Sequence, residues 1–150
     1  MPKFEVRLFD NSASIVHIGE GLLARSLPRE EWTHEAHLAA CTWIVRDRLD
    51  IVPERDLAAI ISGYNEAVGG VNDDSQGYHE TITQVYIVGV KAHLAEVGTA
   101  MPLWQAVNAL LLGPRGRRDL PLRFYSNELL FSVPARRGFV EPDRASFDEI

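Results

Sequence analysis

The chain contains a single cysteine, Cys41, among its 150 residues. One thiol cannot form an intramolecular disulfide and cannot supply a cysteine-based zinc framework. No stretch approaches the roughly 18 consecutive apolar residues that a membrane helix requires. Residues 1–14 also lack the basic segment, the apolar run and the small-residue cleavage site of a secretory signal. These absences predict a cytoplasmic protein that does not span a membrane.

Two familiar nucleotide and hydrolase motifs are absent as well. The short string Gly19-Glu20-Gly21 lacks the spacing of a phosphate-binding loop, and no G-x-S-x-G elbow occurs. The formal net charge is −6, which argues against nucleic acid as a partner because phosphate binding needs a basic field. The one basic cluster, residues 114–123, is short and is interpreted as a solvated loop.

The remaining composition is that of an ordinary globular domain. Hydrophobic residues make up 46% of the chain and charged residues 24%. A chain of this length can bury a self-sufficient core, and no internal repeat, low-complexity tract or long linker divides it. We therefore expect one domain over residues 1–150.

Hydrophobic periodicity predicts an all-α bundle of about five helices with short connections and a wrapped C-terminal tail. Alternation in Phe4–Phe9 predicts either a short strand or an extended arm. The tail carries a short apolar run over residues 127–133, followed by turns that cover the bundle. The expected helices cover residues 15–27, capped by Asn11, Ser12 or Ser14, and residues 28–50, 53–68, 78–97 and 102–112.

Three of the five histidines fall in two unusual strings, WTHEAHL (residues 32–38) and GYHETIT (residues 77–83). His34 and His37 are three residues apart on an expected helix, so both imidazoles lie on one face. Two such rings can share one metal ion, and His79 at the start of another helix is the natural third ligand. This spacing predicts a site for one divalent transition metal ion: zinc, iron, nickel or copper.

Residues near these histidines have candidate roles in the same site. Glu80 or Glu35 would be a further ligand, an orienting partner of an imidazole or a general base on metal-bound water. Helical geometry counts against Glu35, which lies about 100° around the helix from each neighbouring position. We expect Trp32, Tyr78 and Tyr86 to line a ligand-binding pocket beside the histidines.

Three functions are consistent with this pattern. The first is a metal-dependent enzyme acting on a small molecule. The second is a non-catalytic module whose histidines and aromatic residues line a pocket for a small ligand. The third is a structural His/Glu cluster in a helical protein that forms a homodimer, since a histidine at a helix start often only bonds to the backbone. An enzyme needs an open coordination position and a reachable cavity, whereas a binding module needs only the cavity.

The two histidine strings, together with YSNELLFS (residues 125–132) and ARRGFVEPD (residues 135–143), resemble a family of small bacterial proteins. The resemblance covers most of the chain from Trp32 onward. It implies that His34, His37, His79 and Glu80 belong to one shared site, and it implies no particular activity. A looser similarity exists to helical metalloproteins such as the DinB-like proteins, from which this sequence departs in helix pattern and spacing.

Overall fold

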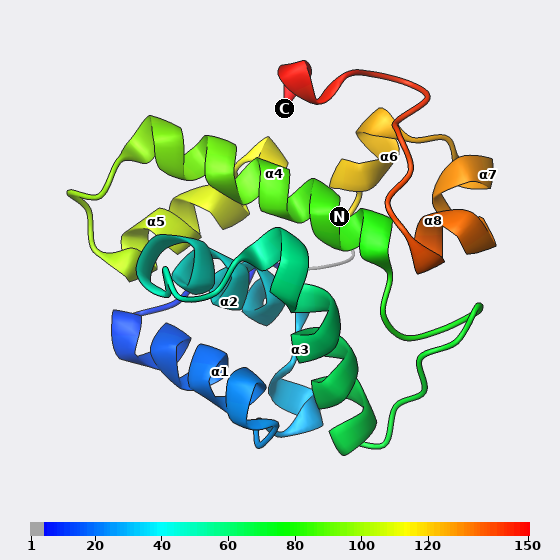
Figure 1. The fold of residues 1–150 in the computed structure, drawn as a ribbon. Helices are drawn as coiled ribbons and strands as arrows, with labels where there is room; N and C mark the ends of the chain where they lie inside the picture. The colour runs from blue at the N-terminus through cyan, green and yellow to red at the C-terminus, as the bar shows by residue number, and fades with distance from the viewer. Residues whose placement is uncertain (1–4) are drawn as a thin grey trace.

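The computed structural model of the chain describes residues 5–150, and these fold into an all-helical bundle without strands (Figure 1). The expected fold class is confirmed. No helix in this range is long and apolar enough to cross a lipid bilayer. The five longest helices are α1 (Ser12–Ala24), α2 (His34–Asp47), α3 (Pro53–Ala67), α4 (Glu80–Val97) and α5 (Leu103–Leu112).

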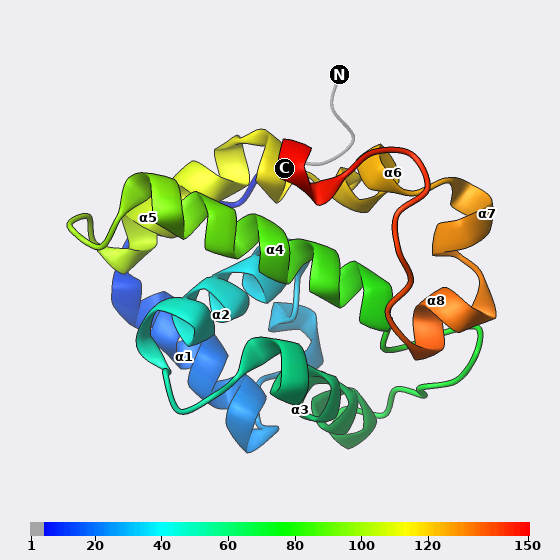
Figure 2. The same ribbon diagram turned by 45° about the horizontal axis from the view of Figure 1, so that its top comes forward.

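Helix α2 is the centre of the bundle. It packs against α1, α3, α4 and α5, with α1 and α3 on one side and α4 and α5 on the other (Figures 1 and 2). Every residue from Leu38 to Ile44 is buried, because this segment is apolar around its whole circumference. Its one hydroxyl, on Thr42, donates to the Leu38 carbonyl at 2.7 Å. His34 and His37 lie just before this buried segment.

The second helix begins six residues later than expected. Residues Arg29–Glu31 form a separate 3-10 turn, and Trp32 then leaves the helical region with φ −86° and ψ 66°. Thr33 is the N-cap of α2, since its hydroxyl accepts from the Ala36 amide at 3.1 Å. The prediction that this helix starts at Pro28 is therefore wrong, because the helix begins after the Thr33 cap and not at the proline. The helix also ends at Asp47 instead of Asp50.

The N-terminal segment is an extended arm. Residues 5–9 have no partner strand, and Phe4 lies outside the described residues. The side-chain amide of Asn108 on α5 substitutes for a strand, because its Oδ1 accepts from the Phe9 amide at 2.9 Å and its Nδ2 donates to the Phe9 carbonyl at 2.8 Å. Of the two predicted alternatives, a short strand or an extended arm, residues 5–9 adopt the extended arm.

The C-terminal part wraps over α4 as a series of short helices (Figure 2). Serines begin three of the turns, because Ser126, Ser132 and Ser146 each accept from a backbone amide two or three residues onward. Phe124, Tyr125 and other apolar side chains bury this layer against Val85 of α4. The short helices are α6 (Leu120–Phe124), α7 (Asn127–Leu130) and α8 (Val133–Arg137), followed by a 3-10 turn at Phe147–Glu149.

We expect alanine substitution at two helical glycines to change the free energy of unfolding in opposite directions. At Gly19 of α1, an added Cβ would lie 2.1 Å from Cε3 of the buried Trp43 ring, so the α1–α2 crossing depends on this glycine. We expect Gly19→Ala to lower the free energy of unfolding by about 1–2 kcal/mol, since overpacking outweighs the gain in helix propensity. At Gly89 of α4 the nearest atom would lie 3.5 Å away, so Gly89→Ala is expected to stabilise by up to about 1 kcal/mol.

Urea denaturation of both variants checks this pair. Equal effects of the two substitutions would contradict the close packing of Gly19 on Trp43.

Candidate functional site

A cavity of about 300 Å³ lies beside the first half of α2, between this helix and α1, α3 and α4. Most of its wall is apolar, and five polar or charged side chains interrupt that wall. The size and the character of the lining are typical of the lower end of small-molecule pockets. The apolar lining consists of Leu22, Trp32, Leu38, Ala40, Cys41, Ile44, Leu57, Ile61 and Ile82, and the polar lining of His34, His37, Thr83, Tyr86 and Arg118.

His37 is a lining residue whose two ring nitrogens both lack a partner among the described residues. It lies on the second turn of α2 and packs against Trp32, with 3.9 Å between the ring centroids. Neither of its ring nitrogens bonds to another described residue, and its accessible surface borders the cavity. Burial, and secondarily the neighbouring His34, lower the pKa of His37 to about 4. The ring is therefore neutral at pH 7 and offers one donor and one acceptor to the cavity.

His34 and Tyr86, which line the cavity, bind the chain segment that precedes Arg118. The His34 Nε2 donates to the Gly116 carbonyl at 2.8 Å, and the Tyr86 hydroxyl donates to the Arg117 carbonyl at 2.6 Å. The two rings meet edge to face, with 5.8 Å between their centroids. Because a carbonyl only accepts, the Nε2 of His34 carries a proton, and in the tautomer with this single ring proton the Nδ1 is an acceptor.

Glu35 is not part of the cavity lining, and its carboxylate lies near the charge of Arg118. Its carboxylate is buried, at 4% exposure, and its Oε1 lies 3.7 Å from Nη2 of Arg118. A buried carboxylate needs such a cationic partner, so Arg118 serves Glu35 as well as the cavity wall. Glu35 thus lies next to the site without lining it.

His79 has a different position and a different task. It is the N-cap of α4, and its Nδ1 accepts from the Ile82 amide at 3.1 Å. Its Nε2 donates to the Leu130 carbonyl at 2.7 Å, which ties α4 to α7. Burial lowers the pKa of His79, so the neutral ring that both bonds require is favoured. Both ring nitrogens are thereby used within the protein fold.

Tyr78 and Glu80 pair with each other outside the cavity lining. The Tyr78 hydroxyl donates to Oε1 of Glu80 at 2.5 Å, and Gln84 donates to Oε2 at 3.3 Å. Burial and the Glu80 carboxylate raise the pKa of Tyr78, so the phenol stays protonated. The two residues therefore form a polar link at the start of α4.

The structure thus divides the predicted site into two places. Trp32, His34, His37 and Tyr86 line one cavity, whereas Tyr78, His79 and Glu80 are engaged at the start of α4. Within residues 5–150, no three His, Cys, Asp or Glu side chains come together as a group that would hold a metal ion. His34 and His37 remain a two-imidazole pair on one wall, and metal binding there stays a prediction.

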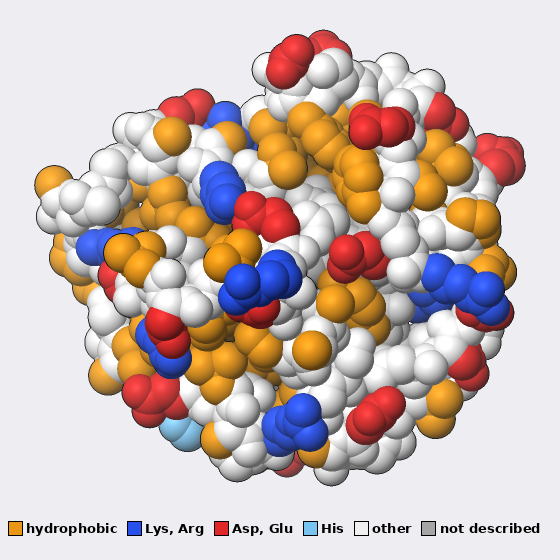
Figure 3. Space-filling view, in the orientation of Figure 1, with side chains coloured by type: hydrophobic (Ala, Val, Ile, Leu, Met, Phe, Trp, Pro, Cys, Tyr) orange, Lys and Arg blue, Asp and Glu red, His pale blue; other side chains and the backbone are white. Residues whose placement is uncertain are grey.

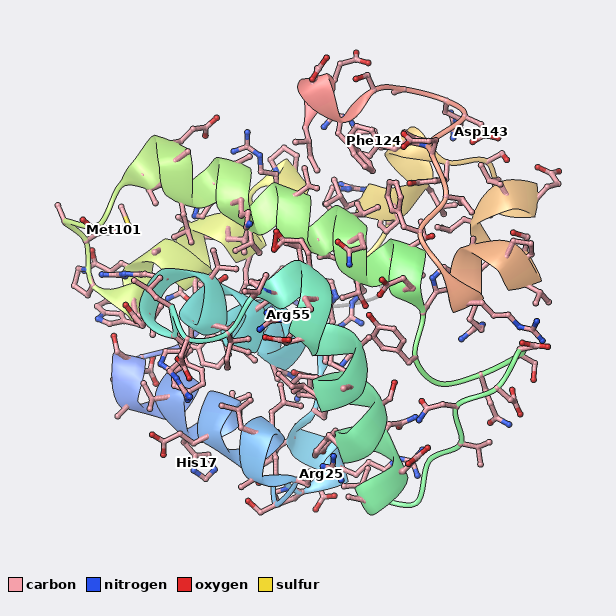
Figure 4. The ribbon with its side chains drawn as sticks, in the orientation of Figure 1. His17, Arg25, Arg55, Met101, Phe124 and Asp143 are labelled. Carbon is pink, nitrogen blue, oxygen red and sulfur yellow. The ribbon has the colours of Figure 1, made fainter. Side chains whose placement is uncertain are left out.

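The two other histidines lie outside the cavity lining. His17 points outward from α1, and its Nε2 lies 3.6 Å from Oε1 of Glu31 (Figure 4). His93 is buried and donates to the Ala106 carbonyl at 2.8 Å. On the face shown in Figure 3, acidic and basic side chains are interspersed without a broad basic patch.

Sequence reasoning did not identify most of the cavity lining, including Leu57, Ile61, Thr83 and Arg118. Leu57 and Ile61 follow the inward periodicity of α3, so they were expected in the core and gave no sign of a cavity. Arg118 belongs to the cluster interpreted as a solvated loop, and its buried partner Glu35 is 83 positions away in the chain. No local signal connects the two.

Comparison of the chain with protein-family models, with curated proteins and with solved structures finds no match. The resemblance that the two histidine strings carry therefore stays a prediction, and the geometry of the cavity is the basis for a function.

Proposed function

We propose that this protein binds a small, largely apolar molecule in the cavity beside α2, with His37 as the polar anchor. One observation carries the proposal: a neutral imidazole without a protein partner borders an otherwise mostly apolar cavity of about 300 Å³. His37 is an exposed residue of the cavity lining, so its two ring nitrogens are open to a bound ligand or to water. The apolar wall favours the ligand over water.

The cavity limits the size and affinity of the ligand. At about 30 Å³ for a water-sized unit, its volume accommodates a molecule of roughly ten non-hydrogen atoms. A molecule of that size that buries an apolar body and makes one hydrogen bond binds with a Kd on the order of 0.1–1 mM. We take 3-phenylpropan-1-ol as the probe.

Filling the cavity is expected to abolish binding of the probe. Ile61 lines the cavity from α3, and Ile61→Trp would place an indole in the space that the ligand occupies. We expect isothermal titration calorimetry to show at least tenfold weaker binding to this variant. Leu112→Trp adds the same ring at a position that is 67% exposed, and it is the matched control.

Ile82→Trp blocks the cavity from α4 and serves if Ile61→Trp fails to fold. Unchanged binding to both filled variants, or no binding of millimolar probe to the wild-type protein, would contradict the proposal.

A metal-dependent enzyme is the second candidate, and one observation favours it. His34 and His37 line the same cavity three residues apart, and the low pKa of His37 leaves its nitrogens free of an extra proton. Zinc, iron or nickel would supply Lewis-acid or redox chemistry there, with the remaining coordination positions open to a ligand.

Metal content separates the two candidates. Inductively coupled plasma mass spectrometry on untagged protein, purified without chelator, would show a near-stoichiometric ion in the wild type and none in folded His34→Ala and His37→Ala variants if the second candidate holds. If the protein takes up no ion from zinc, iron, nickel or copper solutions, the second candidate is wrong and ligand binding is the function that remains.

A further inference from the structure

The hydrogen-bonding groups of the cavity point to the chemical class of its ligand. We infer that the site selects a neutral hydroxyl compound, an alcohol or a phenol with an apolar body, over a carboxylate or an ammonium compound. This inference rests on the proposed binding function and goes beyond it by choosing between ligand classes that would fill the same volume.

The three uncharged lining groups other than His37 have already placed their donor hydrogens. The Nε2–H of His34 and the hydroxyl of Tyr86 donate to the backbone carbonyls of Gly116 and Arg117. The hydroxyl of Thr83 donates to the His79 carbonyl at 2.9 Å. What these three side chains retain is acceptor capacity. A carboxylate only accepts hydrogen bonds, so it would meet lone pairs on three of the five polar lining groups.

The one permanent charge in the wall is also engaged. Arg118 lies 3.7 Å from the buried carboxylate of Glu35. An anionic ligand that drew the guanidinium to itself would leave Glu35 buried without its counter-ion, which is strongly unfavourable. An ammonium ligand would add a cation beside Arg118 in a mostly apolar cavity.

A neutral hydroxyl group matches His37 in both directions. It can donate to the bare ring nitrogen, or it can accept from the ring N–H and donate its own hydrogen to a remaining acceptor nearby. Its desolvation costs far less than that of an ion. The apolar body would then contact the aliphatic wall that Leu57 and Ile61 contribute from α3.

A matched series of four probes tests this inference: 3-phenylpropan-1-ol, 3-phenylpropanoate, 3-phenylpropan-1-amine and propylbenzene, titrated at pH 7.5 by calorimetry. We expect the alcohol to bind at least tenfold more tightly than either charged compound. It should bind about fivefold more tightly than propylbenzene, which is the increment of one hydrogen bond. His37→Leu should bring the alcohol to the affinity of propylbenzene and leave propylbenzene binding intact. His17→Leu, the same substitution on an exposed histidine, should leave the whole series unchanged.

The outcomes separate the two proposals. If the carboxylate binds as tightly as the alcohol, or if His37→Leu preserves the preference for the alcohol, the inference about ligand class is overturned while the binding function stands. If none of the four probes binds to the wild-type protein, the binding function itself falls.

Discussion

Replacing His79 with alanine is expected to lower the free energy of unfolding by about 3 kcal/mol, the largest effect that we predict for any histidine. The substitution removes the acceptor for the Ile82 amide, and loss of an N-cap costs about 1 kcal/mol. It also leaves the Leu130 carbonyl without its buried donor, which costs roughly 1–3 kcal/mol more. Equilibrium urea denaturation at pH 7.5 measures the difference.

Two further variants test the reason for this loss. His79→Asn retains a side-chain acceptor for the cap but is too short to reach Leu130, so it should lose about 2 kcal/mol. His17→Ala removes an exposed imidazole and should change stability by less than about 0.5 kcal/mol. If His79→Ala were as mild as His17→Ala, the capping role of His79 would be wrong.

Acid is expected to destabilise the protein through His37 and His79. The pKa of each ring is lower in the folded chain than the value of about 6.5 in an unfolded chain, so the unfolded state binds more protons and stability rises with pH. Above about pH 6.5 both rings are neutral in the folded and in the unfolded chain, so they do not reduce the free energy of unfolding. The free energy of unfolding falls as the pH drops from there towards 4, where His37 takes up a proton in the folded chain as well.

For His37 we expect the free energy of unfolding to fall by about 2 kcal/mol over this range. This is less than the full pKa difference implies, because the ring borders solvent-accessible space. Urea denaturation at intervals between pH 7.5 and pH 4 measures the slope. Carboxylates contribute to the same slope, so the comparison is with His37→Leu, which should follow a flatter curve. Parallel curves for the two proteins would show that the folded chain does not depress the pKa of His37.

Local patterns in the sequence were enough to predict the main helices. Apolar periodicity marked α3 and α4, and Pro53 and Gly98 marked a start and an end. The start of α2 was missed because Pro28 and Thr33 are both good starting residues, and their order of preference depends on how Trp32 turns the chain. The serines of the tail are N-cap residues, but helices of four or five residues are too short for periodicity to reveal.

Only part of the candidate site was predictable. The spacing of His34 and His37 places them on one face of one helix, and Trp32 and Tyr86 line the same cavity, while a binding role for these residues stays a prediction. The position of His79 depends on Leu130, which is 51 residues away, and nothing in GYHETIT distinguishes a helix cap from a ligand. Arg118 and the segment that His34 holds are also fixed by tertiary packing alone.

The central claim is that His37 is open to a ligand whereas His79 is closed within the fold. Long-range ¹H–¹⁵N correlation spectra of the imidazole rings, recorded with and without 3-phenylpropan-1-ol, test it most directly. We predict that His79 and His93 each carry a proton on Nε2 and do not respond to the probe, while both ring nitrogens of neutral His37 shift as the probe is added. Resonances of His79 that respond to the probe, with those of His37 unmoved, would contradict the account.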